Sequence, residues 1–336
     1  MIVTTKLNSI ARKMVARNKG ILAADESNAT MTKRLESINV VSTPESRRQW
    51  RQLLFQTQDI GDFISGVIMY DETIRQSDDS GKRFVELLAM SDILSGIKVD
   101  KSTHDLAGAP GEFITEGLDG IRDRLAHYYE MGARFAKWRA LLTVGNGRPT
   151  DYAIHTNAHA LGRYAVICQE QGLVPIVEPE ILMDGSHSIA ECRSATKRSL
   201  IAVFEELIAQ RVELGGIVLK PNMIISGSEA PNRAHATEVA RQTIDCLLET
   251  VPPDVPGVAF LSGGQGDEES VVNLDEINKI AANEHLPWEL TYSYGRGLQA
   301  APLVAWLGKT ENVLAGQIAF RKRGLDSSAA REGVFA

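Results

Sequence analysis

The sequence predicts a single-domain α/β protein folded as a closed (β/α)8 TIM barrel. Eight short apolar runs alternate with longer segments of helical periodicity along 336 residues, and no low-complexity stretch or Pro/Gly/Ser linker divides them. Strands of a parallel sheet are short and apolar because helices cover both of their faces. Eight such units in roughly 300 residues are typical of a closed barrel.

Each of the eight strand candidates is apolar, and most are bounded by glycine or polar residues. They occupy residues 20–25, 63–70, 95–100, 132–142, 173–181, 215–223, 257–264 and 290–297. An open doubly wound sheet is the alternative architecture. The glycines after the first run do not form a GxGxxG fingerprint, which favours the barrel.

Apolar residues recur every three or four positions between the runs, which indicates amphipathic helices. The clearest patterns cover residues 118–128, 239–251 and 274–280, together with the long segment 187–211. We expect residues 302–324 to form a closing helix that ends near Gly324. We expect one domain over 1–336, with an N-terminal helical extension over about 1–18 and a flexible C-terminal tail over about 326–336.

Composition excludes several classes of partner. Hydrophobic residues make up 43% and charged residues 24%, and the net charge is −7 with no concentrated basic block, which argues against nucleic acid. No apolar run approaches the roughly 18 residues of a membrane span, so no membrane partner is expected. Cys168, Cys192 and Cys246 are widely spaced, which indicates a reducing, cytoplasmic location. The N-terminal segment has no Asp or Glu before Asp25 and could be a transit peptide, but the spacing of its apolar residues favours an amphipathic helix.

Charged residues gather where the strands of a barrel would end, and this is where barrel enzymes place catalytic groups. The candidates are Asp25, Lys98, Asp100, Lys137, Arg139, Glu178, Glu180, Lys220 and Arg296. A lone charge could merely mark where a strand meets solvent, but three lysines lie within apolar strands. Mutual repulsion and desolvation would favour a neutral amine in at least one of them. A neutral amine can form a Schiff base with a carbonyl, and nearby carboxylates can move protons.

Two glycine-rich loops follow the seventh and eighth strands, at residues 261–264 and 295–297. Such loops expose backbone N–H groups that hold phosphate, and this region is the usual phosphate site of barrels. The sequence therefore predicts a phosphorylated substrate. The spacing of the residues does not by itself choose the nucleophile among Lys98, Lys137 and Lys220.

The motifs resemble those of class I fructose-bisphosphate aldolases. They are KGILAADES (19–27), GIKVDK (96–101), GLDG (117–120), FAKWR (135–139), VPIVEPEIL (174–182), LKPNM (219–223), FLSGGQ (260–265) and YSYGR (292–296). The resemblance covers about residues 8–325. It implies a TIM barrel that cleaves fructose 1,6-bisphosphate in glycolysis and gluconeogenesis without a metal or other cofactor, through a covalent Schiff base on Lys220.

The same resemblance assigns roles to matching positions. Glu178 would dehydrate the carbinolamine, Asp25 would take the C4 hydroxyl proton, and Lys137 would orient both. Glu180 would support them. Ser262, Gly263, Gly295 and Arg296 would bind the C1 phosphate, and Ser27, Lys98, Lys33 and Arg34 would bind the C6 phosphate. Arg139 and Thr30 would also bind substrate, and Thr30 stands where the family usually has serine.

One departure from the family concerns the residue that protonates the enamine intermediate of the reaction. Many members end in a tyrosine implicated in its protonation, whereas the last tyrosine here is Tyr294. We therefore expect Glu178, or a water that it relays, to protonate the enamine.

Three other readings remain open at this level. A metal-dependent aldolase would need clustered ligands, and only His155 and His159 are closely spaced, without the glutamate of HExxH. A sugar-phosphate-binding barrel without catalysis is the second. The same chemistry acting mainly on sedoheptulose 1,7-bisphosphate or fructose 1-phosphate is the third. The resemblance also implies a homotetramer whose partner molecule is a small phosphorylated sugar.

Overall fold

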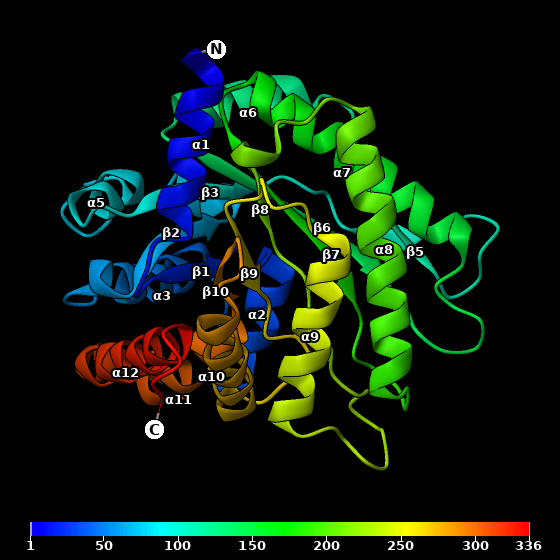
Figure 1. Cartoon of the computed structure of the whole chain (residues 1–336). Coiled ribbons are helices and arrows are strands. Elements are labelled where there is room, and N and C mark those ends of the chain that lie inside the picture. Colours follow the sequence, from blue (N-terminus) through cyan, green and yellow to red (C-terminus); the bar gives the residue numbers. More distant parts are fainter. Residues whose placement is uncertain (1, 336) are drawn as a thin grey trace.

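A computed structural model describes residues 2–335. Its centre is a closed barrel of parallel strands, surrounded by helices (Figure 1). The barrel strands are β1 (Gly20–Ala24), β2 (Ile64–Met69), β3 (Leu94–Lys98), β6 (Phe135–Leu142), β7 (Val174–Ile181), β8 (Val218–Leu219), β9 (Gly257–Phe260) and β10 (Glu289–Tyr294). The order around the barrel is β1-β10-β9-β8-β7-β6-β3-β2, which confirms the predicted fold class.

The helices occupy the segments between the strands. They are α1 (Ile2–Met14), α2 (Asn28–Glu36), α3 (Pro44–Phe55), α4 (Asp71–Ile74), α5 (Phe84–Met90), α6 (Ile121–Glu130), α7 (Asp151–Glu170), α8 (Ile189–Ala209), α9 (Ala236–Thr250), α10 (Asp267–Glu284), α11 (Arg296–Trp306) and α12 (Val313–Arg331), with short 3-10 turns η1 (Ile60–Asp62), η2 (Leu214–Gly216) and η3 (Thr310–Asn312). Capping residues determine where several of these helices begin. Ser188 and Glu191 form a capping box at α8, and Thr43 with Ser46 does so at α3. None of these helices is both long and apolar enough to cross a bilayer.

Helix α1 covers the N-terminal end of the barrel. Its residues Leu7, Ala11 and Met14 are buried against the strand residues Ile21 and Val174, among others. The Ser65 hydroxyl donates to the Met14 and Gly20 carbonyls, which ties the helix to β1 and β2. Helix α1 therefore closes the N-terminal end of the barrel, and the C-terminal ends of the strands lead to a cavity.

The end of the chain differs from the sequence-based expectation. Two helices, α11 and α12, replace one, because Leu307 and Gly308 adopt positive φ angles of 52° and 71° and end the first helix. Gly324 does not stop α12. A Cβ there would lie 2.1 Å from the Phe63 ring, so this glycine permits close packing of helix on barrel.

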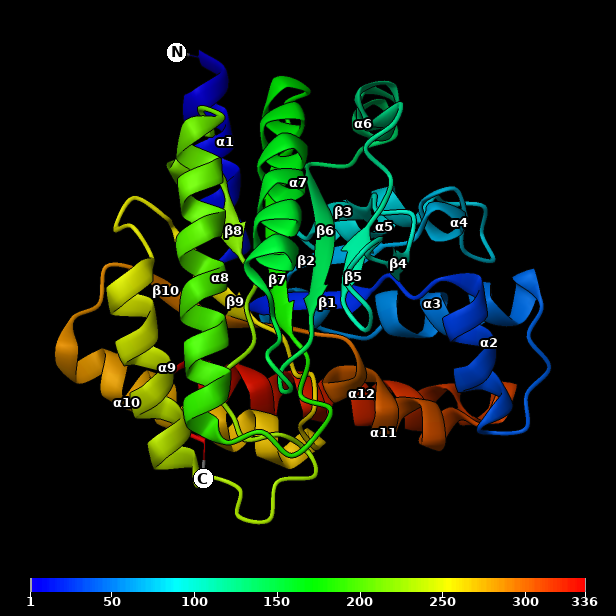
Figure 2. The same cartoon turned by 90° about the vertical axis from the view of Figure 1, so that its right-hand side faces the viewer.

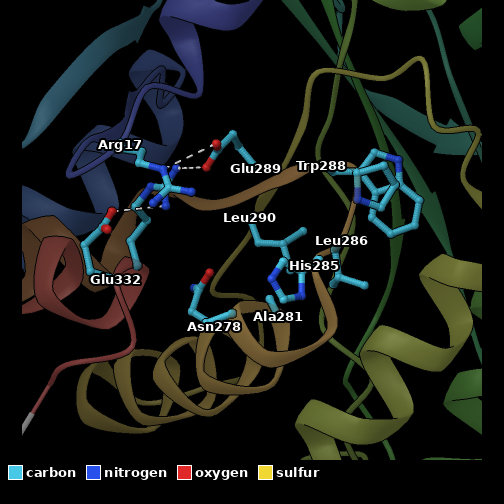
Figure 3. Close-up of a pocket in the computed structure, with 12 residues that line it drawn as sticks. Arg17, Asn278, Ala281, His285, Leu286, Trp288, Glu289, Leu290 and Glu332 are labelled. Carbon is cyan, nitrogen blue, oxygen red and sulfur yellow. Dashed lines mark hydrogen bonds and ion pairs between the residues drawn. The ribbon is translucent and has the colours of Figure 1, made fainter.

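Residues 326–331, which were expected to begin a flexible tail, are the last turns of α12. Arg331 is buried and bonds to Glu289 and to the Val15 carbonyl, while Glu332 accepts the Asn18 backbone N–H. These contacts border a cavity of about 330 Å³ (Figure 3). The segment lies at the N-terminal end of the barrel, away from the catalytic strand ends.

A small hairpin of β4 (Thr103–Asp105) and β5 (Phe113–Thr115) follows β3 and was not predicted. Its first strand, Thr-His-Asp, lacks the apolar pattern of a core strand. Figure 2 shows the hairpin beside β6, and the Thr115 hydroxyl donates to the Arg139 carbonyl in that strand. The hairpin thus supports the loop that leads from β3 toward the cavity.

Candidate active site

The C-terminal ends of the strands surround one cavity of about 280 Å³. Its wall contains Ala23, Asp25, Glu26, Ser27, Thr30, Arg34, Lys98, Lys137, Arg139, Glu178, Glu180, Lys220, Leu261, Ser262, Gly263, Ser293, Gly295 and Arg296. Of the residues predicted for the site, all except Lys33 and Asp100 are in this set, and Asp100 pairs with Lys98 from outside it. Lys33 is exposed on α2 and does not line the cavity, because neighbouring helical residues point about 100° apart and Arg34 takes the inward position.

Lys220 lies directly after the two-residue strand β8, where its backbone N–H bonds to the Val177 carbonyl at 2.8 Å. The residue is only 4% exposed. Its Nζ is 3.1 Å from Glu178 Oε1, so the buried amine has a carboxylate partner. The pair can exchange a proton at that distance, which would leave Lys220 as a neutral nucleophile.

Lys137 joins the second carboxylate to the same group. Its Nζ is 2.7 Å from Asp25 Oδ2 and 3.4 Å from Glu178 Oε2. Two amines and two carboxylates from β6, β7, β8 and the end of β1 therefore form one buried chain of charges. Glu178 lies in its middle and contacts both lysines.

The electrostatics of this group bear on Lys137. We expected repulsion and desolvation to favour a neutral amine in at least one of the three lysines, and Lys137 is not that one: burial lowers its pKa, but the charges of Asp25, Glu178 and Asp100 outweigh burial and raise that pKa well above its usual value. Burial alone would raise the pKa of Asp25, yet Lys137, Lys220 and Lys98 hold it well below its ordinary range. These shifts favour a charged Lys137 and an ionised Asp25 at neutral pH.

Glu178 is the proton carrier that the geometry favours. Burial raises its pKa, but the charges of Lys137, Lys220 and Arg139 prevail, so the pKa is lowered overall. Its Oε2 accepts no hydrogen bond within residues 2–335. An ionised Glu178 can therefore receive the Lys220 proton and retain acceptor capacity toward a substrate hydroxyl.

Arg139 and Glu180 form a second pair on the same side of the cavity, with Arg139 Nη2 donating to Glu180 Oε1 at 2.8 Å. Arg139 and Glu178 are register partners on neighbouring strands, which explains why the pair adjoins the lysine cluster. A Cβ on Gly263 would meet Glu180 Oε1 at 3.1 Å. Glu180 therefore links the strand-end charges to the glycine loop after β9.

The start of α11 and the loop after β9 form one end of the cavity, which is suited to bind an anion. Gly295 precedes α11 without a side-chain cap, so the first backbone N–H groups of the helix remain available. Arg296 is exposed at that terminus and Ser262 faces it, with its Oγ 3.3 Å from the Cβ position of Gly297. A helix N-terminus with an arginine and a hydroxyl favours phosphate.

A second cationic end lies at α2. Ser27 caps this helix and its Oγ is 3.1 Å from Thr30 Oγ1. Lys98 reaches the same region, held by Asp100 at 3.2 Å, and Arg34 pairs with Glu26. Six cationic and four acidic side chains line the whole cavity, so it favours an anion although the protein carries a net charge of −7.

Sequence reasoning missed three buried residues of the site: Glu26, Arg51 and Gln299. Arg51 Nη2 donates to Glu26 Oε2 at 2.5 Å, and Gln299 Nε2 donates to Glu26 Oε1 at 2.8 Å. Two features of the sequence weakly indicated a role for Glu26 and Arg51: Glu26 adjoins Asp25 in AADES, and Arg51 interrupts an apolar helical face. Nothing in the local sequence marks Gln299.

Tyr294 and His159 do not line the cavity. Tyr294 is fully buried and donates to the Ser270 carbonyl, and burial raises its pKa. His159 on α7 contacts Glu206. Within the described part of the chain, no group of three or more His, Cys, Asp or Glu residues could hold a metal ion.

Comparisons with known proteins agree with this geometry. The family model described as fructose-bisphosphate aldolase class-I matches residues 6–336. A cytosolic fructose-bisphosphate aldolase of Arabidopsis thaliana is 50% identical over 100% of this chain and 85% of its own length. A probable class 1 fructose-bisphosphate aldolase of Xanthomonas axonopodis is 47% identical over 98% of both chains.

A solved structure of fructose-bisphosphate aldolase from Plasmodium falciparum, in complex with TRAP and a small-molecule inhibitor, is also similar. It has a TM-score of 0.98 and 46% identity, over 100% of this chain and 96% of that one. With the family model matching nearly the whole length, the chain belongs to the class I fructose-bisphosphate aldolase family.

Proposed function

We propose that this enzyme reversibly cleaves fructose 1,6-bisphosphate to dihydroxyacetone phosphate and glyceraldehyde 3-phosphate through a Schiff base on Lys220. The observation that carries the proposal is the buried Lys220–Glu178 pair at 3.1 Å, next to Lys137 and Asp25. The family names support the substrate. The two cationic ends of the cavity suit a ligand with a phosphate at each end.

The first step joins enzyme and substrate. Glu178 takes a proton from Lys220, and the neutral amine attacks the C2 carbonyl to form a carbinolamine. Glu178 then returns a proton to the C2 hydroxyl, which leaves as water and produces an iminium. The positive charge of Lys137 helps to hold Glu178 and Asp25 in place during both transfers.

Cleavage follows at the C3–C4 bond. Asp25 takes the C4 hydroxyl proton, C4 becomes the aldehyde of glyceraldehyde 3-phosphate, and the bonding electrons enter the iminium to form an enamine. Glu178, which has taken up a proton from solvent, or a water that it relays, protonates C3, while Asp25 returns its proton to solvent. Hydrolysis of the new iminium then releases dihydroxyacetone phosphate and Lys220. The C1 phosphate occupies the end formed by Ser262, Gly263, Gly295 and Arg296, and the C6 phosphate the end formed by Ser27, Thr30, Lys98 and Arg34, with Arg139 and Glu180 between them.

The proposed enzyme uses no metal or other cofactor, because the iminium formed on Lys220 supplies the electron sink. A cytoplasmic location is supported by relatives named as cytosolic or cytoplasmic. The resemblance to the family supports a homotetramer, which light scattering at micromolar concentration would test.

Borohydride trapping tests the mechanism. Borohydride added with dihydroxyacetone phosphate should inactivate the enzyme and add one reduced adduct per chain on Lys220. Lys220→Met should give no adduct, whereas Lys322→Met, which changes an exposed surface lysine, should behave as wild type. An adduct on Lys98 or Lys137 would contradict the assignment of the nucleophile. Cleavage rates on fructose 1,6-bisphosphate, sedoheptulose 1,7-bisphosphate and fructose 1-phosphate would then rank the substrates.

A further inference from the structure

A buried network lies behind the strand end that carries Asp25. Glu26, Arg51 and Gln299 are 9%, 2% and 1% exposed and come from the segment after β1, from α3 and from α11. Arg51 and Gln299 are 248 positions apart, yet Arg51 Nη1 donates to Gln299 Oε1 at 3.2 Å. All three residues contact one another, and only Glu26 lines the cavity.

The amide of Gln299 bonds to a residue on each side of Asp25, to the backbone of Ala23 and to the side chain of Glu26. Its Nε2 donates to the Ala23 carbonyl and to Glu26 Oε1, each at 2.8 Å. Its Oε1 accepts the indole N–H of Trp50 at 3.1 Å in addition to Arg51. Because both ends of this amide have buried partners, the side chain has a single satisfied orientation. The turn from Ala23 to Glu26 is fixed with it.

Arg51 supplies the charge that keeps Glu26 in this turn. Its Nη2 is 2.5 Å from Glu26 Oε2, and the two side chains are 3% and 5% exposed. A buried carboxylate without such a partner would be strongly unfavourable. Arg34 also pairs with Glu26, but its side chain is 27% exposed and lines the cavity. Arg51 and Gln299 therefore hold Glu26 from the side that substrate does not reach.

Asp25 itself has little side-chain support. Lys137 is the cation in contact with its carboxylate, and within residues 2–335 no other side chain or backbone group donates to it at hydrogen-bond distance. The direction of the carboxylate therefore depends on the backbone of residues 23–26. We propose that Glu26, Arg51 and Gln299 are positioning residues that hold Asp25 in the geometry needed to take the C4 hydroxyl proton.

This inference rests on the proposed function, and it predicts an effect on one step only. Schiff-base formation on Lys220 and proton exchange at C3 use Glu178, whereas C3–C4 cleavage uses Asp25. A displacement of about 1 Å in a catalytic group can reduce a rate roughly 100-fold. Loss of the network should therefore slow cleavage and leave the earlier steps intact.

The experiment compares Gln299→Met and Arg51→Met with Arg331→Met as a matched control. The Arg331 side chain is 4% exposed and lies 2.5 Å from Glu289, as the Arg51 side chain is 3% exposed and lies 2.5 Å from Glu26, but Arg331 bonds to the Val15 carbonyl at the N-terminal end of the barrel. Three rates are measured below the unfolding temperature of each variant: borohydride-trapped adduct formation with dihydroxyacetone phosphate, loss of deuterium from its C3, and kcat for fructose 1,6-bisphosphate cleavage.

We expect kcat for cleavage to fall between about 10- and 100-fold in Gln299→Met and Arg51→Met, while trapping and exchange stay within about twofold of wild type. Arg331→Met should lower thermal stability but keep all three rates. Trapping and cleavage that fall together, or a cleavage loss no larger than that of Arg331→Met, would overturn the positioning role alone. A wild-type enzyme that forms no adduct would instead reject the proposed function and this inference with it.

Discussion

Replacing Lys137 with methionine should destabilise the protein and make its stability depend on pH. Lys137 is 4% exposed and is the cation that joins Asp25 to Glu178, at 2.7 Å and 3.4 Å. Methionine has a similar length and no charge. The variant therefore leaves two buried carboxylates with one fewer cation between them.

The magnitude follows from the remaining partners. Removing one member of a buried ion pair costs about 3–5 kcal/mol, because the other charge stays buried. Glu178 keeps Lys220 at 3.1 Å, so we expect the lower end of that range. An unfolding entropy of about 2.1 cal/mol/K per residue gives about 0.7 kcal/mol/K for a chain of 336 residues. A loss of about 3 kcal/mol then lowers Tm by about 4 °C.

The sign of the pH effect follows from the two pKa shifts. Asp25 has a lowered pKa in the folded state, so its contribution is complete above the unfolded value of about 3.9 and is lost as pH falls through the folded value. Lys137 has a raised pKa, so its contribution is complete below about 10.4 and is lost as pH rises through the folded value. Between about pH 5 and 9 both contributions are therefore complete in wild type.

In Lys137→Met the carboxylates can relieve their burial by binding protons, so the deficit in stability should be largest near pH 8 and smaller near pH 5. Denaturant unfolding at both pH values measures it. Adding Asp25→Asn to Lys137→Met should recover part of the loss, and Lys322→Met, at an exposed i,i+4 pair, should change stability by less than about 0.5 kcal/mol. Equal deficits at the two pH values, with no recovery by Asp25→Asn, would refute the reasoning.

Three further predictions concern binding, the chain end and metals. Arg296→Ala should raise KM for fructose 1,6-bisphosphate by a factor equivalent to about 2–3 kcal/mol, because Arg–phosphate hydrogen bonds are charge-assisted. The increase should be much smaller for an analogue without the C1 phosphate. Equal increases in steady-state KM for the two substrates would show that Arg296 does not bind that phosphate. Deleting residues 328–336 should lower Tm by several degrees, since it removes the buried Arg331 and its bond to Glu289. Deleting residues 333–336 should keep the cleavage rate within about threefold of wild type, which corresponds to a change of less than about 0.7 kcal/mol in the activation free energy. A tenfold loss of cleavage in the shorter deletion would assign the chain end a catalytic part. Cleavage should survive dialysis against a chelator, and activity restored only by added divalent metal would contradict a Schiff-base route.

The sequence by itself determined the fold and most of the cavity wall. Eight buried strands produce eight short apolar runs, and a barrel brings the residue after each run to one face. Asp25, Glu178 and Lys220 could therefore be assigned to one site because each follows or ends a strand. Their separate roles, in contrast, came from the family motifs, since spacing does not distinguish one buried lysine from another.

The tertiary structure decided what depends on distances between remote residues. It placed Gln299 against Glu26, 273 positions away, and it surrounded Lys137 with carboxylates whose charges outweigh the effect of burial on its pKa. It also directed Arg34 inward and Lys33 outward, and used Gly324 for packing against Phe63 where a helix stop was expected. Periodicity is a local signal that each segment carries in its own residues. Hydrogen bonds and electrostatic fields depend on atoms a few ångströms apart, and only the folded chain defines those neighbours.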